Sequence, residues 1–217
     1  MRPRPQSFLT YPFDVLLGSQ AGVRVLRVVT LHGGALSAPT VARQASLSAA
    51  VTRTALGDLT AAGLVAALGQ GRAMSYQFDA THPLAPAIEQ LFRAERGRRG
   101  RVLDGLRDAV LALRPAPIGV WVYGSVARGE DTIASDVDVA LCVADPLLLE
   151  TQTAALREAA AAIDEAQRVA ISVISFTADD AARLAREDAP IWRGLVEDGV
   201  TLAGQMPAAV AALARSA

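Results

Sequence analysis

Residues 118–143 read IGVWVYGSVARGEDTIASDVDVALCV, and no other stretch indicates as much about how the chain folds. One apolar run ends in Gly124-Ser125, a polar stretch follows, and a second apolar run carries Asp136 and Asp138. Carboxylates two residues apart on a strand project from the same face, because side chains alternate along a strand. Two unpaired negative charges are costly on an apolar strand. The pattern therefore predicts a divalent cation between them, and hard oxygen ligands suit Mg²⁺.

The Gly124-Ser125 pair directly follows the first of these strands. A tight turn at this place exposes backbone N–H groups and leads into a helix, which is a favourable environment for phosphate. Together with the two carboxylates, the turn predicts a nucleotide site. Around it we expect strands over 118–123, 137–143 and 169–176 and a helix over 147–167.

The composition is that of a globular protein without membrane spans. The 217 residues are 52% hydrophobic, and the single cysteine, Cys142, lies in an apolar strand, which excludes an internal disulfide and a cysteine-based zinc site. No apolar run approaches the roughly 18–20 residues needed to span a bilayer. Pro12 and Asp14 interrupt any signal-like stretch near the N-terminus. These features predict a cytoplasmic protein with no membrane partner.

Charge is distributed unevenly along the chain. Residues 1–116 hold 14 arginines and 7 acids, a net charge of +7, whereas residues 117–217 hold 7 arginines and 15 acids, a net charge of −8. Such asymmetry suggests that the two halves meet different partners. A basic half suits nucleic acid, and an acidic half suits a metal.

Residues 20–80 show three short helices followed by a hairpin. Helices are expected from Gln20 to Thr30, from Ala38 to Gln44 behind Ser37, and after Ser48 up to Gly63. Two strands, 64–68 and 73–78, enclose a Gly-rich tip with Arg72. This order, with LGDLTAAGLV at 56–65 and GRAMSYQF at 71–78, resembles the winged helix-turn-helix domains of bacterial transcription regulators.

The winged-helix resemblance implies binding of double-stranded DNA. The helix after Ser48 would enter the major groove, with Val51 facing inward and Thr52 and Arg53 outward, and Arg72 would reach a phosphate or the minor groove. The candidate DNA-binding residues are therefore Ser48, Thr52, Arg53 and Arg72. A degenerate winged helix that serves dimerisation or domain docking is the alternative, and winged-helix regulators are often homodimers.

A long helical pattern, residues 82–116, connects the two halves and ends at Pro115 and Pro117. It carries a cluster of arginines, which we interpret as a solvated helix face, a DNA-backbone contact or a partner of the acidic half: Arg93, Arg96, Arg98, Arg99 and Arg101. The expected domains are 1–81, a winged helix-turn-helix with an N-terminal arm over 1–17; 82–116, a linker helix; and 117–217, a nucleotide-binding domain.

Gly124-Ser125, ten residues, then Asp136-Val137-Asp138 resembles the signature of minimal nucleotidyltransferases of the DNA polymerase β-like superfamily. The resemblance covers residues 117–203. It implies that Gly124, Ser125, Arg128 and Ser135 bind a nucleoside triphosphate, with ATP as the expected nucleotide. It also implies that Asp136 and Asp138 are catalytic and coordinate Mg²⁺ or Mn²⁺. The expected fold class is α+β, with a C-terminal mixed sheet flanked by helices.

The third strand departs from that family. A third carboxylate is expected on it, but residues 168–175, RVAISVIS, contain none. Ser172 is a poor base at neutral pH. Three functions therefore stay open: Mg²⁺-dependent nucleotide transfer to a hydroxyl of a protein or small molecule, a DNA-binding regulator that senses a nucleotide, and an antitoxin-like partner of a toxin.

Overall fold

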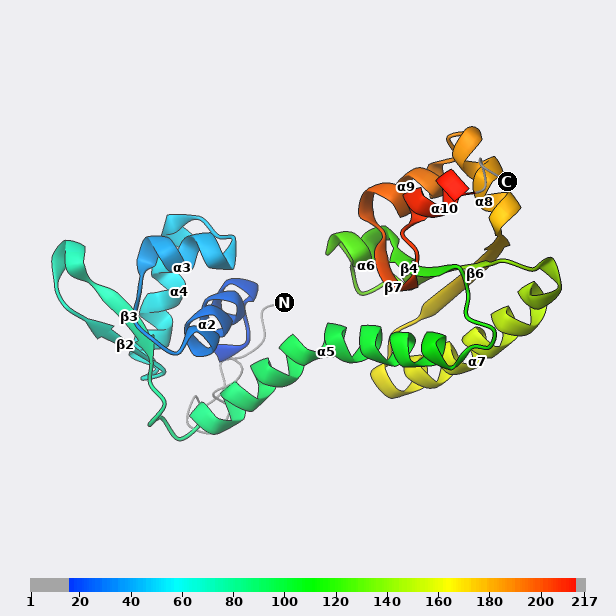
Figure 1. Ribbon diagram of the computed structural model, residues 1–217. Helices are drawn as coiled ribbons and strands as arrows, with labels where there is room; N and C mark the ends of the chain where they lie inside the picture. Colours follow the sequence, from blue (N-terminus) through cyan, green and yellow to red (C-terminus); the bar gives the residue numbers. More distant parts are fainter. Residues whose placement is uncertain (1–15, 214–217) are drawn as a thin grey trace, which may run out of the picture. The chain divides into compact units, whose positions relative to one another are not determined.

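The computed structural model describes residues 16–213, except for the side chains of Arg72, Ala211 and Leu213. The expected arm over 1–17 lies almost wholly outside these residues. The chain divides between Gly97 and Arg98 into two compact units. Helix α5, which runs from Ala85 to Ala112, passes through this division and contributes to both units (Figure 1).

The first unit contains three helices, a small sheet and the start of α5. Its sheet is antiparallel, in the order β1-β3-β2. Its elements are α2 (Gln20–His32), β1 (Leu36–Ser37), α3 (Ala38–Ala45), α4 (Ala49–Ala61), β2 (Val65–Leu68), the 3₁₀ turn η1 (Gly71–Ala73) and β3 (Ser75–Phe78).

Serine caps set the starts of these helices. The side chains of Ser19, Ser37 and Ser48 accept hydrogen bonds from backbone N–H groups in the first turns of α2, α3 and α4. Such caps satisfy N–H groups that have no partner within the helix. The predicted caps at Ser37 and Ser48 and the predicted hairpin are confirmed in position.

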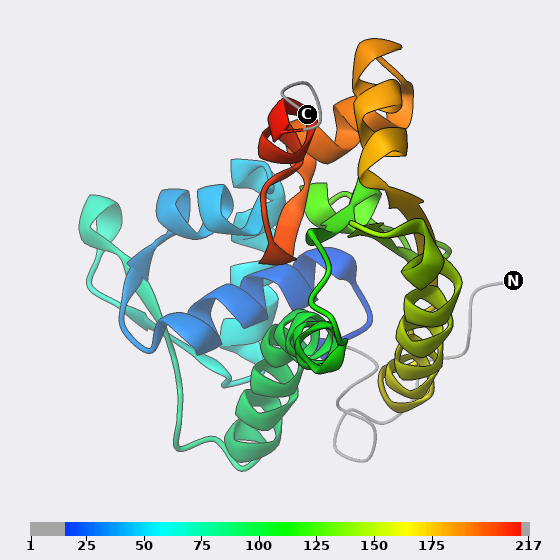
Figure 2. The ribbon, with the colours of Figure 1, turned by 45° about the vertical axis from the view of Figure 1, so that its right-hand side comes forward.

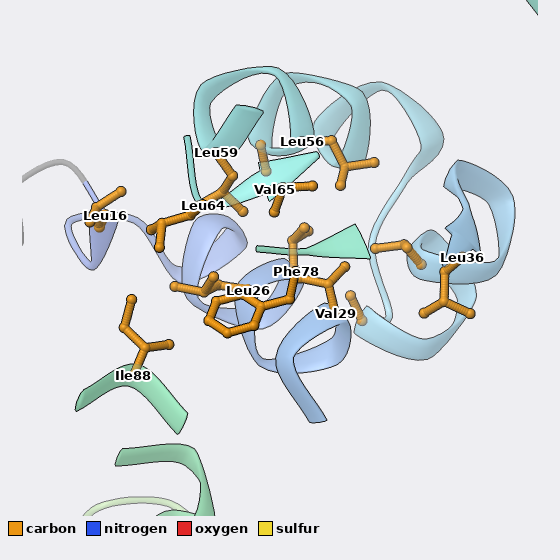
Figure 3. Close-up of a cluster of buried hydrophobic side chains, with 14 of the residues drawn as sticks. Leu16, Leu26, Val29, Leu36, Leu56, Leu59, Leu64, Val65, Phe78 and Ile88 are labelled. Carbon is orange, nitrogen blue, oxygen red and sulfur yellow. The ribbon is translucent and has the colours of Figure 1, made fainter. Parts of the chain in front are cut away.

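A single apolar core holds the first unit together (Figure 3). Leu26 and Val29 of α2 face Leu56 of α4 and Phe78 of β3, and all four side chains are buried. Ile88 at the start of α5 joins the same core. Outside the core, Arg27 donates two hydrogen bonds to Glu95, at 2.5 and 2.7 Å, and lies over the ring of Phe92. These contacts join the beginning of α5 to α2.

The second unit is built on a four-stranded sheet in the order β6-β5-β4-β7. Strands β4 and β5 are antiparallel, as are β4 and β7, whereas β5 and β6 are parallel and are connected through α7. Its elements are β4 (Gly119–Tyr123), α6 (Gly124–Arg128), β5 (Val137–Val143), η2 (Pro146–Leu148), α7 (Leu149–Gln167), β6 (Ile171–Thr177), α8 (Ala178–Arg186), α9 (Pro190–Asp198), β7 (Val200–Gly204) and α10 (Pro207–Leu213).

Helices cover both faces of this sheet (Figures 1 and 2). Val120 and Val139 point to one face, where they meet Leu106 of α5 and Leu156 of α7. The opposite face carries a second apolar cluster with side chains from α8, α9 and α10, namely Trp121, Ala140, Cys142, Phe176, Ala181, Trp192, Leu195 and Val210. The predicted mixed sheet flanked by helices is confirmed.

Two arginines of the basic cluster bind the end of α7. Arg98 donates to the carbonyl oxygens of Gln167 and Arg168, both at 3.0 Å, and Arg101 contacts the side chain of Gln167. A cation is favourable at a helix C-terminus because the last carbonyl groups lack helical partners. Arg98 therefore contributes to the packing of α5 against α7. Within residues 16–213, no helix is both long and apolar enough to cross a bilayer.

Candidate functional site

A row of three polar side chains crosses the sheet of the second unit. Tyr123 of β4 pairs with Asp138 of β5, and Asp138 pairs with Ser172 of β6. Directly opposite residues on neighbouring strands point to the same face. Tyr123, Asp138 and Ser172 therefore lie side by side, and each is half-buried.

On β4, β5 and β6, the rest of that face is apolar. On these three strands, the next row consists of Trp121, Ala140 and Ile174, and Thr201 of β7 lies beside Trp121 at the end of the row. Trp121, Ala140 and Ile174 pack against side chains of α8, α9 and α10. The row of Tyr123, Asp138 and Ser172 therefore lies just beyond the part of the sheet that these helices cover. This is the accessible end of the sheet.

Gly124 brings the backbone close to the Asp138 carboxylate. Its φ is +74°, a conformation that side chains other than glycine rarely adopt. A Cβ added to Gly124 would lie 2.5 Å from Asp138 Oδ2, so the Asp138 carboxylate would have to shift. Glycine is therefore strongly favoured where β4 turns into α6, and it lets the Asp138 carboxylate lie against the backbone.

Asp138 lies in an environment that disfavours its negative charge. Partial burial raises the pKa of its carboxyl group, and the neighbouring Asp136 raises it further. The pKa of Tyr123 is also raised, first by burial and then by Asp138 and Asp136. Within residues 16–213, neither Asp136 nor Asp138 accepts a hydrogen bond or forms an ion pair through its carboxylate. A divalent cation fits this pair of uncompensated oxygen ligands.

Ser135 belongs to a turn that precedes Asp136. Its hydroxyl accepts a hydrogen bond from the backbone N–H of Thr132 at 3.0 Å and lies 3.2 Å from the Thr132 hydroxyl. The backbone N–H of Ser135 in turn donates to the Thr132 carbonyl. These bonds close the turn, so the side chain of Ser135 shapes the loop that presents Asp136.

Arg128, at the end of α6, is bound by two carboxylates. Its Nε donates to Glu130 at 2.8 Å and its Nη1 to Asp198 of α9 at 3.2 Å. These two bonds raise the pKa of its guanidinium group further. Arg128, which was predicted to bind phosphate, is thus held by two acidic side chains, and one of them, Asp198, is distant in sequence.

β6 offers a serine where a third carboxylate would face the pair. Ser172 is the residue of β6 that lies opposite Asp138. Asp180, which follows this strand, is engaged elsewhere, since it forms a capping box with Thr177 and an ion pair with Arg183. Among the residues described, no group of three or more His, Cys, Asp or Glu side chains is arranged to hold a metal ion.

The part of the chain that contains this site matches a known protein family. Residues 103–182 match the family model of the nucleotidyltransferase domain. The matched region contains all the residues of the site that the sequence predicted in this unit, and also Tyr123 and Ser172. It ends within α8, so α9, β7 and α10 lie beyond it.

Two toxin-antitoxin structures are among the solved structures similar to this chain. One is described as a crystal structure of the toxin-antitoxin with AMP-PNP, with 21% identity, coverage of 54% of this chain and 84% of that chain, and a TM-score of 0.36. Another is a mutant of the toxin-antitoxin MntA-HpeT, with 18% identity, the same coverage and a TM-score of 0.36. A search of curated proteins gives no match.

In the first unit, α4 carries two of the candidate DNA-binding residues and follows a third. Ser48 caps the helix through its side chain. Arg53 is exposed, as predicted. Thr52 is fully buried, with its hydroxyl bonded to the Ser48 carbonyl, so its predicted outward orientation is wrong. Val51, predicted to face inward, is 43% exposed.

The rotation of α4 about its own axis explains why Thr52 is buried. Thr52 shares one helical stripe with Ala55, Leu56 and Leu59, at spacings of three, four and seven residues, and all four are buried. A buried Thr hydroxyl is satisfied by bonding to the carbonyl four residues before it. Arg72 lies in η1 at the tip of the hairpin, and its side chain is outside the described part of the chain.

Replacement of Asp138 by asparagine is expected to stabilise the metal-free second unit at neutral pH. Since the pKa of Asp138 is raised on folding, its favourable contribution exists below about pH 4 and is lost as the pH rises through its folded-state pKa. The gain should be below about 1 kcal/mol, because solvent screens a partly exposed group. Urea unfolding at pH 7 and at pH 4 measures it.

Tryptophan fluorescence reports this transition, because both tryptophans, Trp121 and Trp192, lie in the second unit. The stabilisation should shrink toward pH 4. Asp188→Asn is a control with the same change of charge at an exposed turn, where it removes only an exposed ion pair with Arg193 at 3.7 Å. An Asp138→Asn variant that is less stable than the wild type at pH 7 would contradict the raised pKa.

Proposed function

We propose that the chain binds a nucleoside triphosphate with Mg²⁺ or Mn²⁺ and transfers its nucleotide to a hydroxyl acceptor. The observation that carries the proposal is the Asp136–Asp138 pair, which has no compensating partner among the described residues and lies beside the Gly124 turn. The match of residues 103–182 to the nucleotidyltransferase domain supports it. ATP is the nucleotide that we propose.

Asp136 and Asp138 would hold the cation, and phosphate oxygens would complete its ligands. Mg²⁺ is commonly bound by one or two carboxylates together with substrate phosphates. When bound, the cation neutralises charge that develops on the transferred phosphoryl group. Gly124 and Ser125 would contact the phosphates through the backbone N–H groups of the turn.

The proposed reaction exchanges one bond at the α-phosphorus. The acceptor oxygen forms a bond to this atom, the bond to the pyrophosphate oxygen breaks, and pyrophosphate leaves. The proton of the acceptor hydroxyl passes to water, because Ser172 is too weak a base to take it at neutral pH. A positioned base typically contributes about 10²–10⁴-fold, so we expect slow transfer.

Incubation with labelled ATP, GTP, CTP or UTP and Mg²⁺ or Mn²⁺ tests the proposal. Label on protein or small-molecule acceptor, together with released pyrophosphate, is the expected result. Both should be lost in the Asp136→Asn variant. Nucleotide binding without any turnover would contradict transfer, and absence of binding would contradict the nucleotide site itself.

The presence of Ser172 where a third carboxylate was expected favours a second candidate function. In this function the domain binds a nucleotide as a signal without transferring it. The first unit would then act as a winged helix-turn-helix regulator of DNA binding. The outward face of α4 suits close approach to a groove, since it offers Arg53 among small residues, namely Ala49, Ala50, Thr54 and Gly57. An acceptor protein or a toxin as partner, and a homodimer, stay predictions.

Replacement of Arg53 by alanine tests the DNA-binding part. We expect a lower affinity for duplex DNA, by about fivefold or more, and a salt dependence whose slope falls by about 1, because one cationic contact is removed. Titrations at several salt concentrations measure both values. Arg186→Ala, which removes a cation from α8, is the matched control. A wild-type affinity that does not change with salt would contradict DNA-backbone binding.

A further inference from the structure

An ion cluster connects α6 to α9 beside the proposed nucleotide site. Arg128 bonds to Glu130 and to Asp198, and these side chains are 40%, 66% and 29% exposed, respectively. Asp198 is the last residue of α9 and the least exposed of the three. Arg128 lies four residues after Gly124, within the same short helix. Whatever binds Arg128 therefore influences both the Gly124 turn and the end of α9.

The cluster as it stands is a poor receptor for phosphate. Two carboxylates around one guanidinium give it a net charge of −1. Arg128 uses two of its five N–H groups in these bonds, and the other three have no partner within residues 16–213. A phosphate group can reach them, but it must approach two negative charges. Removal of either carboxylate from Arg128 would lower this repulsion.

The negative charge of Asp198 needs compensation by Arg128 more than the negative charge of Glu130 does. A negative side chain at the C-terminal end of a helix is unfavourable, because the last carbonyl groups carry partial negative charge. Arg128 compensates this charge at the end of α9. The backbone N–H of Gly199 donates to the Leu195 carbonyl at 3.1 Å and closes the last turn. Loss of the Arg128 contact would leave Asp198 unpaired there and would weaken this turn.

We propose that Asp198 is an autoinhibitory residue that competes with the nucleotide's phosphates for Arg128. Binding of a magnesium nucleotide transfers Arg128 from Asp198 to a phosphate and loosens the last turn of α9. This inference rests on the proposed nucleotide site and adds a regulatory role for α9. The strand after α9, β7, pairs with β4, which ends at that site. A change at Asp198 is therefore connected to the site through the sheet as well.

Calorimetric titration of the full chain with Mg²⁺–ATP and with Mg²⁺–tripolyphosphate tests the competition. Asp198→Asn should bind both ligands about two- to fivefold more tightly, the range that an exposed ion pair contributes. Asp188→Asn carries the same change of charge on a 75% exposed side chain and should bind like the wild type. In an Arg128→Gln background, Asp198→Asn should have no further effect.

Hydrogen exchange at the Gly199 amide tests the release of α9. In the wild type, Mg²⁺–ATP should increase exchange there, whereas Arg128→Gln should exchange rapidly with or without nucleotide. Unchanged or weaker binding by Asp198→Asn, or an equal gain in Asp188→Asn, would overturn the inference while leaving the nucleotide site intact. Absence of binding to every variant and to the wild type would instead overturn the proposed function.

Discussion

Asp138→Asn is expected to reduce nucleotide transfer by about 10²- to 10³-fold, the usual effect of removing one group that stabilises charge in a reaction site. Asp138 lies between Tyr123 and Ser172 in the polar row and against Gly124, so no neighbouring acid in that row can replace it. Asparagine has the same shape but no charge, and it binds Mg²⁺ far more weakly than a carboxylate does. Release of pyrophosphate from labelled nucleotide measures the loss.

A measurement of the stability of Asp138→Asn distinguishes an effect on the reaction from an effect on folding. Because burial and Asp136 disfavour the charge of Asp138, Asp138→Asn should be at least as stable as the wild type at pH 7. A loss of activity with retained stability would thus indicate a role in the site. Asp188→Asn should retain full activity. If Asp138→Asn transferred nucleotide at the wild-type rate, the two-carboxylate site would be wrong.

Ser172→Asp is expected to increase the rate of transfer by about 10²- to 10⁴-fold, which is the contribution of a positioned general base. The register places this side chain directly opposite Asp138, on the same face of the sheet and one strand away, about 4.8 Å between backbones. A carboxylate there would face both the metal pair and an incoming hydroxyl. Single-turnover kinetics with Mg²⁺ and with enzyme in excess over labelled nucleotide measure the gain.

Two variants control for this gain. Ser172→Asn adds the same bulk without charge and should leave the rate unchanged. Ser175→Asp puts a carboxylate on the opposite face of the same strand, where Ser175 bonds to Thr153, and it should give no gain. Three close carboxylates repel one another, so Ser172→Asp should be less stable without Mg²⁺ and regain stability with it. A rate unaffected by Ser172→Asp would show that proton removal does not limit the reaction.

Local patterns were sufficient to predict most elements. Caps such as Ser37 and Ser48 act on N–H groups within three residues, and glycines such as Gly33 end helices through their own backbone conformation. These effects need no knowledge of the fold. The rotation of α4 was harder to predict, because alanine, valine and threonine at 49–52 give almost no contrast between faces. Packing against α2 decides that Thr52 is buried and Val51 is exposed.

Helix α5, which was predicted to be a linker, shows a second limit of prediction from the sequence. Its apolar spacing predicted a helix, which α5 is, but not which side chains each part would meet. Ile88 and Phe92 belong to the core of the first unit, whereas Leu106 and Val110 belong to that of the second. Spacing along a helix reveals an apolar stripe, but it does not reveal the surface that covers the stripe.

By itself, the sequence determined where the chemistry of the second unit is expected. Gly124-Ser125 and Asp136-Val137-Asp138 stand close together along the chain, and alternation on one strand is a local rule. Only the tertiary structure decided that Ser172 lies opposite Asp138 and that Asp198 holds Arg128. Strand register and helix docking join residues 34 and 70 positions apart. Such pairings depend on how whole surfaces pack, and no pattern within a short window specifies them.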